Sequence, residues 1–200
     1  MSLRQDILDN DEIFDLEIEG EDLSYLDFSG KSFENIRFSD VRFISTNFEK
    51  ASLRNVSFIS SDLSFTIFDN AFLSSSVFTE SLLKGTSFLT ADMRKTIFDN
   101  INVLYGVFSS SVMKECAIRN SSFKDSDFTD IKSVKSILSD VEFKGSSFFN
   151  TTLNSFKMDK VSFLSSNFSE NLKELKGVKI NLESAVSILK GYDIDLDLSL

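Results

Sequence analysis

A large apolar side chain recurs at every fifth position over most of the chain. Of the 32 positions taken in steps of five from Ile13 to Phe168, 17 are Phe, 14 are Leu, Ile, Met or Val, and only Ser133 is polar. A period of five fits neither an α-helix of about 3.6 residues per turn nor a strand, whose side chains alternate between two faces. The chain must therefore turn a corner every five residues, so that each central side chain points to one common axis.

Four such corners close a square coil, and successive coils stack at about the inter-strand spacing of 4.8 Å. The repeats then form about eight coils of about 20 residues each, a rod of roughly 40 Å. We therefore expect an all-β solenoid. The expected divisions are an N-terminal cap over residues 1–12, the repeats over 13–170 and a C-terminal segment over 171–200.

Two further registers support this coil. Positions two residues before the centres are nearly all small, as at Thr46, Ala51 and Ser76, and only small side chains fit beside a large centre at interior packing density. Cys116 falls in this register, so we interpret it as a buried packing residue. The Phe residues at twenty-residue spacing predict an aromatic stack that forms the structural core: Phe28, Phe48, Phe68, Phe88, Phe108, Phe128, Phe148 and Phe168. The polar centre at Ser133 predicts a local bulge or distortion.

The net charge of −10 is concentrated at the two ends of the chain. Residues 1–30 carry a net −9 and residues 191–200 a net −3, whereas the span 31–190 carries a net +2. The acidic N-terminal run can act as a charged cap that blocks edge-to-edge stacking, or as an acidic docking surface. The charge therefore favours capped ends over an acidic surface along the whole rod.

The composition excludes most catalytic chemistry. The chain has no His and one Cys, which excludes imidazole catalysis, His-ligated zinc or haem, thiolate clusters and an internal disulfide framework. Its seven glycines are scattered and form no phosphate-binding loop. We expect a non-enzymatic protein without cofactor or metal. No signal peptide, membrane span or basic stripe with interleaved aromatics is recognisable, which favours a cytoplasmic protein that does not bind nucleic acid directly.

The five-residue pattern resembles the pentapeptide-repeat family, whose loose motif is A(D/N)LXX, in a Phe-centred form. Residues 61–65 (SDLSF) and 91–95 (ADMRK) stand close to that motif. The resemblance extends over roughly residues 13–168. It implies a right-handed quadrilateral β-helix.

The five-residue frame ends after Phe168, and a different pattern follows. Asn181 to Gly191 predicts a short helix, with Asn181 at its start and Gly191 at its end. Alternating Leu/Ile and Asp from residue 193 onward predict a half-buried strand. A helix this short needs docking, so the segment either closes the last coil or pairs with a second copy.

The tail KGVKINLESAVSILKGYDIDLDL resembles the C-terminal dimerisation segment of the Qnr-type quinolone-resistance proteins and the related albicidin-resistance and microcin-immunity proteins. This resemblance implies a tail-to-tail homodimer. The predicted interface consists of Leu182, Ala185, Val186, Ile188, Leu189, Ile194 and Leu196.

Two functions remain open. The resemblance implies a DNA-mimicking rod that binds DNA gyrase or topoisomerase IV and modulates or protects it from drugs or toxins. The alternative is a general protein-protein interaction scaffold with no topoisomerase activity. In either case the candidate partner surface combines the tail carboxylates with outward-facing apolar residues: Asp193, Asp195, Asp197, Phe65, Phe72, Val77, Ile97 and Tyr105.

Overall fold

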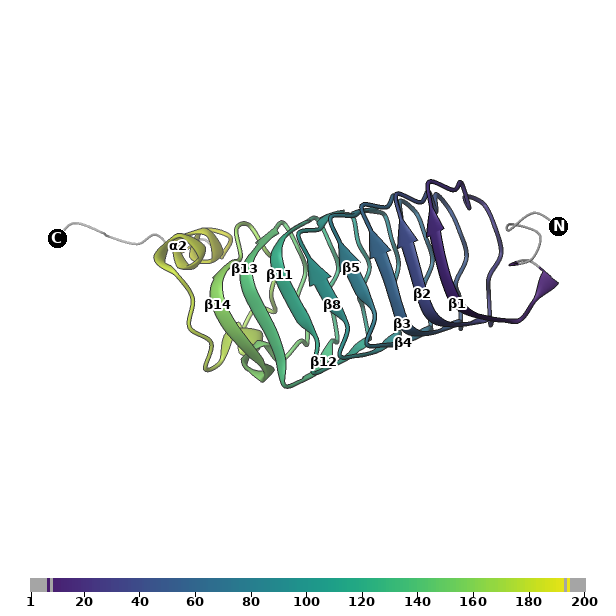
Figure 1. Cartoon of the computed structure of the whole chain (residues 1–200). Coiled ribbons are helices and arrows are strands. Elements are labelled where there is room, and N and C mark those ends of the chain that lie inside the picture. Colours follow the sequence, from purple (N-terminus) through teal and green to yellow (C-terminus); the bar gives the residue numbers. More distant parts are fainter. Residues whose placement is uncertain (1–6, 8, 193, 195–200) are drawn as a thin grey trace.

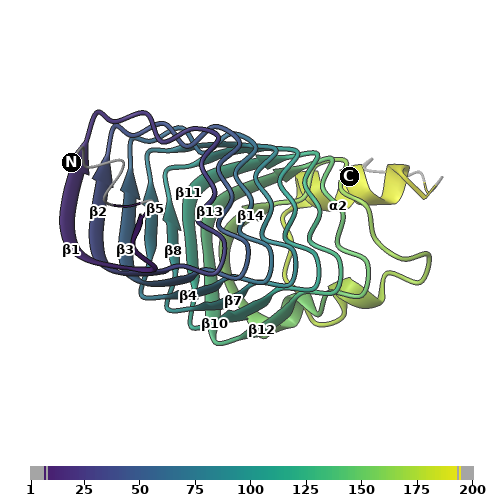
Figure 2. The same cartoon turned by 90° about the vertical axis from the view of Figure 1, so that its right-hand side faces the viewer.

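The structure is a computed structural model that describes residues 7, 9–192 and 194. In it the chain forms a rod of stacked coils (Figure 1). It is a parallel β-solenoid of about eight turns, with about 20 residues in each turn and a short C-terminal helix. Turning the rod by 90° shows the coils following one another from the N-terminal to the C-terminal end (Figure 2). The fold expected from the five-residue period is confirmed.

Strand pairing in the described part of the chain is parallel throughout, and each residue pairs with the one twenty positions later, as Phe33 does with Leu53. The longer strands are β1 (Glu12–Glu19), β2 (Ser32–Ser39), β3 (Ser52–Ile59), β11 (Ala117–Lys124), β13 (Ser136–Lys144) and β14 (Phe156–Ser162). Three-residue strands lie between them: β4 (Phe72–Ser74), β5 (Val77–Thr79), β6 (Leu82–Lys84), β7 (Asp92–Arg94), β8 (Ile97–Asp99), β9 (Asn102–Leu104), β10 (Val112–Lys114) and β12 (Lys132–Val134).

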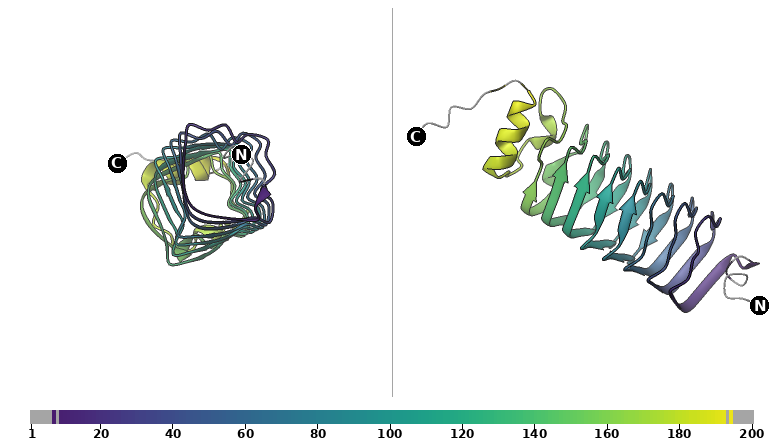
Figure 3. Two further views of the ribbon diagram at one scale, coloured as in Figure 1. Left: turned by 45° about the vertical axis from the view of Figure 1, so that its right-hand side comes forward. Right: turned by 90° about the horizontal axis from the view of Figure 1, so that it is seen from above.

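The coils enclose a four-sided outline, seen along the rod in Figure 3. We number the sides by their central residues, which recur every twenty positions. Side 1 is centred on Ile13 and its equivalents, side 2 on Ile18, side 3 on Leu23 and side 4 on Phe28. The coils are numbered from the N-terminus and each begins with side 1, so that coil one contains residues 11–30 and coil eight residues 151–170. Side 1 contains the first halves of β1–β3 and then β4, β7, β10 and β12. Side 4 is held by isolated parallel bridges such as Asn47 to Ile67.

The corners are made by residues with left-handed backbone. Every fifth residue from Asp15 to Ser165 has a positive φ, with the single exception of Ser155. A positive φ is tolerated best by Gly, Asn and Asp, and these types occupy many of the corners, as at Gly20, Gly30 and Asn35. The five-residue period of the fold therefore has a backbone cause as well as a side-chain one.

The predicted aromatic core is present. From Phe48 to Phe168 the Phe rings of side 4 lie face to face in consecutive coils, with ring centroids 4.9 Å apart for Phe68 and Phe88 and 4.8 Å for Phe108 and Phe128. Phe rings of side 2 add edge-to-face contacts, as between Phe88 and Phe98. All eight predicted core rings are buried, and such contacts add about 0.5–1.5 kcal/mol per pair beyond area burial.

The small inward register is also confirmed, and it has a hydrogen-bonding role. The hydroxyl of Thr66 donates to the carbonyl of Phe43 at 2.8 Å, and that of Thr86 donates to Leu63 at 2.8 Å. These side chains therefore tie each coil to the previous one. Cys116 occupies an equivalent position and is buried, with its Sγ 3.3 Å from the carbonyl oxygen of Met93.

The bulge predicted at Ser133 is absent. Ser133 lies in β12 and pairs in register with Met113, because hydrogen bonds from Lys132 N to Ser111 O and from Glu115 N to Val134 O hold the strand against the preceding coil. The regular corner is lost one coil later, where Leu153–Ser155 forms the 3₁₀ turn η1 and Phe156 takes the position that Cys116 and Ser136 hold in the two preceding coils. The prediction of an irregularity at this side was therefore wrong by one coil.

The turn and helix that follow the repeats pack against the last coil, as shown by the hydrogen bond from Phe163 N to Ser184 Oγ at 2.9 Å. The turn η2 (Lys173–Leu175) is followed by helix α2 (Leu182–Lys190), in which the side chain of Asn181 accepts a hydrogen bond from Ser184 N at 2.8 Å. This confirms the predicted helix and its N-cap. Glu174 is buried beside the last coil and accepts hydrogen bonds from Asn150 N (2.9 Å) and Ser169 Oγ (2.7 Å).

Candidate interaction surface

Three aromatic side chains share the corner between sides 3 and 4. Tyr25, Phe65 and Tyr105 have positive φ values of 61°, 59° and 58° and are 77%, 50% and 57% exposed. They occur in alternate coils, so neighbouring rings are about 10 Å apart along the rod. The other positive-φ positions between Asp15 and Ser165 hold Gly or polar residues. We call these three residues the aromatic corner.

The residues between these aromatics are small. Ser45 and Gly85 occupy the same corner in the intervening coils. The Phe65 ring lies over Gly85, because a Cβ built on Gly85 would be 2.7 Å from Phe65 Cδ1. Lys84 Nζ lies 5.8 Å from the centroid of the same ring.

Further apolar side chains border this corner. Ile67 and Leu89 on side 4 and Leu82 on side 3 are exposed. The candidate partner residues Phe72, Val77 and Ile97 are only half-buried and lie on sides 1 and 2. The predicted partner residues thus separate: Phe65 and Tyr105 gather at one corner, and the other three lie elsewhere on the rod.

Side 4 next to the aromatic corner is acidic. Within residues 26–170 its only base is Lys50, which pairs with Glu49 at 2.8 Å. Hydrogen bonds from the Ser29 side chain and backbone hold the pKa of Asp27 below its usual value. Burial raises the pKa of Asp127, but hydrogen bonds from Ser109 and Thr129 outweigh it and lower the pKa overall. The carboxylates of this side are Asp27, Glu49, Asp69, Asp127, Asp130 and Glu170.

Side 1 is basic from the third to the seventh coil. It carries six bases against Asp92 and Glu115. The guanidinium groups of Arg54 and Arg94 each lie 5.4 Å from the centroid of the Phe72 ring. The expectation of no basic stripe with an interleaved aromatic was therefore wrong, because the stripe is assembled from separate coils. Its bases are Arg54, Arg94, Lys95, Lys114, Lys132 and Lys135.

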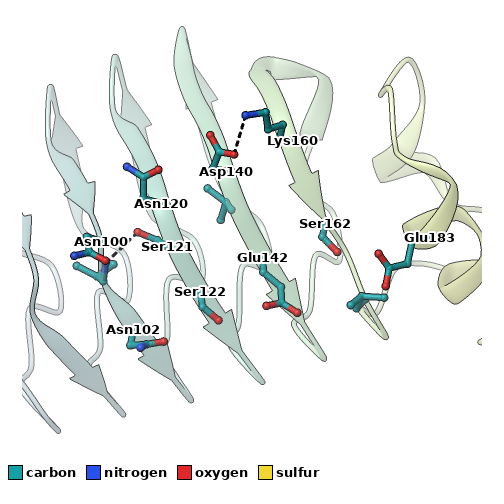
Figure 4. Close-up of a pocket in the computed structure, with 13 residues that line it drawn as sticks. Asn100, Asn102, Asn120, Ser121, Ser122, Asp140, Glu142, Lys160, Ser162 and Glu183 are labelled. Carbon is teal, nitrogen blue, oxygen red and sulfur yellow. Dashed lines mark hydrogen bonds and ion pairs between the residues drawn. The ribbon is translucent and has the colours of Figure 1, made fainter.

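A shallow polar groove of about 610 Å³ follows the corner between sides 2 and 3 in coils five to eight (Figure 4). Asn100, Asn120 and Asp140 line it from successive coils, and Lys160 Nζ pairs with Asp140 at 3.3 Å. Glu183 of α2 lies at its C-terminal end. The groove offers amides, hydroxyls and carboxylates, but no nucleophile paired with a base.

The described residues contain no cluster of three or more His, Cys, Asp or Glu side chains that could hold a metal ion. Burial raises the pKa of the Cys116 thiol to about 11, so this sulfur stays protonated and unreactive at neutral pH. No helix in the described part of the chain has the length and apolar character needed to span a bilayer.

The predicted dimer residues are divided by the structure. Ile188 is buried against its own chain, whereas Leu182 is 66% exposed and Ile194 is 46% exposed. Ala185, Val186 and Leu189 are half-buried. Leu196 and the tail carboxylates Asp193, Asp195 and Asp197 lie outside the described residues.

Comparison with known proteins points to one family. The model of the family "Pentapeptide repeats" matches residues 22–55 and 36–74, with eight copies. No curated protein sequence matches the chain.

Several solved structures are similar to this chain. A trypsin-treated form of QnrB1, a plasmid-mediated fluoroquinolone resistance protein, is 21% identical, with a TM-score of 0.49 over 85% of this chain and 96% of that one. HetL, a pentapeptide repeat protein involved in heterocyst differentiation regulation in Nostoc sp. strain PCC 7120, is 13% identical, with a TM-score of 0.30 over 78% and 86%. Rfr23 from Cyanothece 51142 is 15% identical, with a TM-score of 0.32 over 80% and 92%.

The family match falls in coils whose geometry is the same as that of the coils that follow them. The chain is therefore a β-solenoid of about eight turns, and residues 22–74 of it match the model of the pentapeptide-repeat family.

Proposed function

We propose that this chain is a non-catalytic protein-binding rod, and that its partner contacts the aromatic corner and the adjoining side 4. The observation that carries the proposal is the placement of Tyr25, Phe65 and Tyr105 at exposed positions with positive φ. A left-handed backbone costs a non-glycine residue about 1–2 kcal/mol. Rings that are half or more exposed leave apolar surface open to solvent, and such surface marks contacts with other molecules. Strained backbone positions likewise gather at functional sites.

The chemistry of the surface indicates the kind of partner. Aromatic side chains are the commonest anchors of protein interfaces. Next to them, the carboxylates of side 4 are balanced only by Lys50, which Glu49 already neutralises. The partner should therefore have a basic surface with apolar recesses beside it.

A type II topoisomerase such as DNA gyrase or topoisomerase IV is the most specific partner that we propose. Its DNA-binding saddle is basic, and an acidic rod can compete for it. Support comes from the acidic side 4 and from the resemblance of residues 176–198 to the tail of the Qnr-type group. Binding of this kind would modulate the enzyme or protect it from quinolones or toxins.

A general scaffold role is the second candidate, and the basic side 1 favours it. Duplex DNA is anionic along its whole length, whereas Arg54, Lys114 and Lys132 give this rod a positive side. On this alternative the rod contacts a different basic protein through the same aromatic corner. A cytoplasmic location remains a prediction under both alternatives.

A tail-to-tail homodimer also remains a proposal. Leu182 is exposed at the start of α2 and available to a second copy, whereas Ile188 already packs in its own chain. Leu182→Asp therefore tests this contact without unfolding the cap. We expect the variant to sediment as a smaller species than the wild type if the tail contact forms.

A DNA supercoiling assay with purified gyrase tests the named partner. The wild type is titrated into the assay with and without a fluoroquinolone. The variant Tyr25→Ser/Phe65→Ser/Tyr105→Ser is titrated in parallel. We expect inhibition or drug protection by the wild type and at least a tenfold weaker effect of the variant. No effect of the wild type at high molar excess rules out the topoisomerase and leaves the scaffold role.

A further inference from the structure

The charge of side 1 changes sign along the rod. Its first two coils together carry a net −3, with Glu12, Asp15 and Glu34 exposed and Lys31 as their one base, while its later coils are basic. Among the described residues, none of these three carboxylates forms an ion pair, and neither do Lys114, Lys132 and Lys135. One side of the molecule thus carries unpaired charges of both signs, separated along its length.

We propose that side 1 pairs with side 1 of a second copy, in antiparallel orientation about a two-fold axis that passes through the fourth coil at Phe72. This contact is independent of the proposed function, because it leaves the aromatic corner and side 4 open. The partner that the surface fits is this chain itself.

The parallel register supplies the argument. Side 1 presents three outward columns, and in the first column Glu12, Phe72 and Lys132 occupy coils one, four and seven. An antiparallel turn about the fourth coil places Glu12 opposite Lys132 of the second copy. It also places the half-buried Phe72 opposite its own equivalent at the centre of the contact.

The second column also places complementary side chains of the two copies opposite each other. Phe14 and Val134 are 63% and 49% exposed, and they occupy coils one and seven, so the turn places these two apolar side chains opposite each other. Glu34 in coil two comes opposite Lys114 in coil six in the same way. One like-charged pair remains, Arg54 with Arg94.

The repulsion between Arg54 and Arg94 of the second copy is reduced by a contact within each chain. Arg94 donates to Asp92 at 2.7 Å and 3.1 Å, so part of its charge is already neutralised. The third column adds another attractive pair, because Asp15 comes opposite Lys135. The two-fold axis produces every one of these contacts twice.

Neither neighbouring register gives the same match between unlike charges of the two copies. With the second copy shifted by one coil in one direction, Phe14 meets Lys114 and Asp15 meets Glu115. With a shift in the other direction, Arg54 meets Lys114 and Glu34 meets Val134. Only the register centred on the fourth coil opposes charges of unlike sign at both ends.

The area is compatible with a weak dimer. Seven coils of about 4.8 Å and five residues of about 3.3 Å give a side of roughly 34 Å by 16 Å, or about 1,100 Å² over both copies. That is close to the lower limit of about 1,000 Å² for a specific interface. A contact of this size held by exposed charges weakens strongly with salt.

An acidic peptide or a nucleic acid fits the side less well. Either would use only the basic coils, and it would be repelled by Glu12, Asp15 and Glu34 at the N-terminal end. A second copy uses both halves of the side at once.

A charge swap tests the proposal on the full chain. One protein carries Lys132→Glu/Lys135→Glu and the other carries Glu12→Lys/Asp15→Lys. Each variant alone should self-associate at least tenfold more weakly than the wild type in sedimentation velocity at low salt. An equimolar mixture of the two should recover association, because all end contacts are again of unlike sign. Lys124→Glu/Lys144→Glu on side 3 makes the same change in net charge and should associate as the wild type does.

A tagged pull-down distinguishes the side 1 contact from a contact between the tails of two copies. In a tagged pull-down, the tagged Lys132→Glu/Lys135→Glu protein should retain untagged Glu12→Lys/Asp15→Lys protein more than an untagged copy of itself, and a tail contact would retain both equally. Equal retention, or wild-type association of the charge-reversed variants, overturns the proposal. So does a wild type that shows no salt-sensitive association but binds poly-glutamate or single-stranded DNA through Lys132 and Lys135.

Discussion

The ring of Phe65 lies over Gly85, its equivalent in the next coil, where a Cβ would be 2.7 Å from Phe65 Cδ1. The ring thus depends on the absence of a side chain at the neighbouring corner. Gly30 has a similar backbone, with φ of +70°, but no atom lies within 4 Å of its Cβ position. These two glycines therefore separate backbone strain from the seating of the ring.

Gly30→Ala should lower the free energy of unfolding by about 1–2 kcal/mol, which is the cost of a left-handed backbone for alanine. Gly85→Ala should carry this cost and also displace the Phe65 ring, so that its partner binding falls as well. Urea unfolding of both variants, with a binding assay beside it, checks the difference. Equal partner binding by the two variants would show that the seating of the ring does not matter.

Two phenylalanines should respond in opposite ways. Phe88 is fully buried between Phe68 and Phe108 in the aromatic stack, and Phe88→Ala should cost about 3–5 kcal/mol. Phe65→Asn should leave the free energy of unfolding unchanged or raise it by up to about 1 kcal/mol, because it relieves backbone strain. A large loss of stability in Phe65→Asn would mean that the ring supports the fold.

Glu174 should make stability depend on acid pH. Burial raises its pKa, but hydrogen bonds from Ser169 and from the backbone of Asn150 lower it overall. The stabilisation is therefore fully present above the pKa of the unfolded state, near 4.3, and is lost as the pH falls through the lower folded value. Glu174→Ala should cost about 1–3 kcal/mol at pH 7 and less at acid pH.

Glu183→Gln is the matched control for Glu174, since Glu183 is exposed on α2. Urea unfolding at neutral and acid pH should show no comparable loss in this variant. An equal pH dependence of wild type and Glu174→Ala would contradict the role given to Glu174.

Cys116 should be unreactive in the folded protein. Its thiol is buried and its pKa is raised to about 11, so a thiol reagent at pH 8 should modify it only after denaturant is added. Rapid modification under native conditions would show that the coil around Cys116 opens readily.

Much of the fold could be predicted, because one physical rule repeats in every coil. The five-residue spacing identifies the buried rings, and both Asn181 and Gly191 mark the ends of α2. Ser133 shows the limit of this rule. Its polar side chain breaks the pattern of large centres, but the hydrogen bonds of β10 and β12 keep the strand in place.

The interaction surface was harder to predict, because it is assembled from different coils. A net charge of +2 over residues 31–190 conceals a basic side 1 and an acidic side 4. The signal was present in the sequence, since residues twenty positions apart share a column and their charges can be summed by side. The same grouping places Tyr25, Phe65 and Tyr105 on one corner. Glu174 lies beyond the repeats, so no periodicity indicates the backbone groups that it meets.

Site-specific photo-crosslinking in cells tests most directly the claim that the aromatic corner binds a partner protein. A photoreactive phenylalanine analogue at position 65 is compared with the same analogue at Ser60, which lies at a positive-φ corner of the same coil between sides 2 and 3. We predict a discrete protein adduct from position 65, which disappears when Tyr25 and Tyr105 are replaced by Ser, and none from position 60. The same adducts from both positions, or none from position 65, would contradict the account.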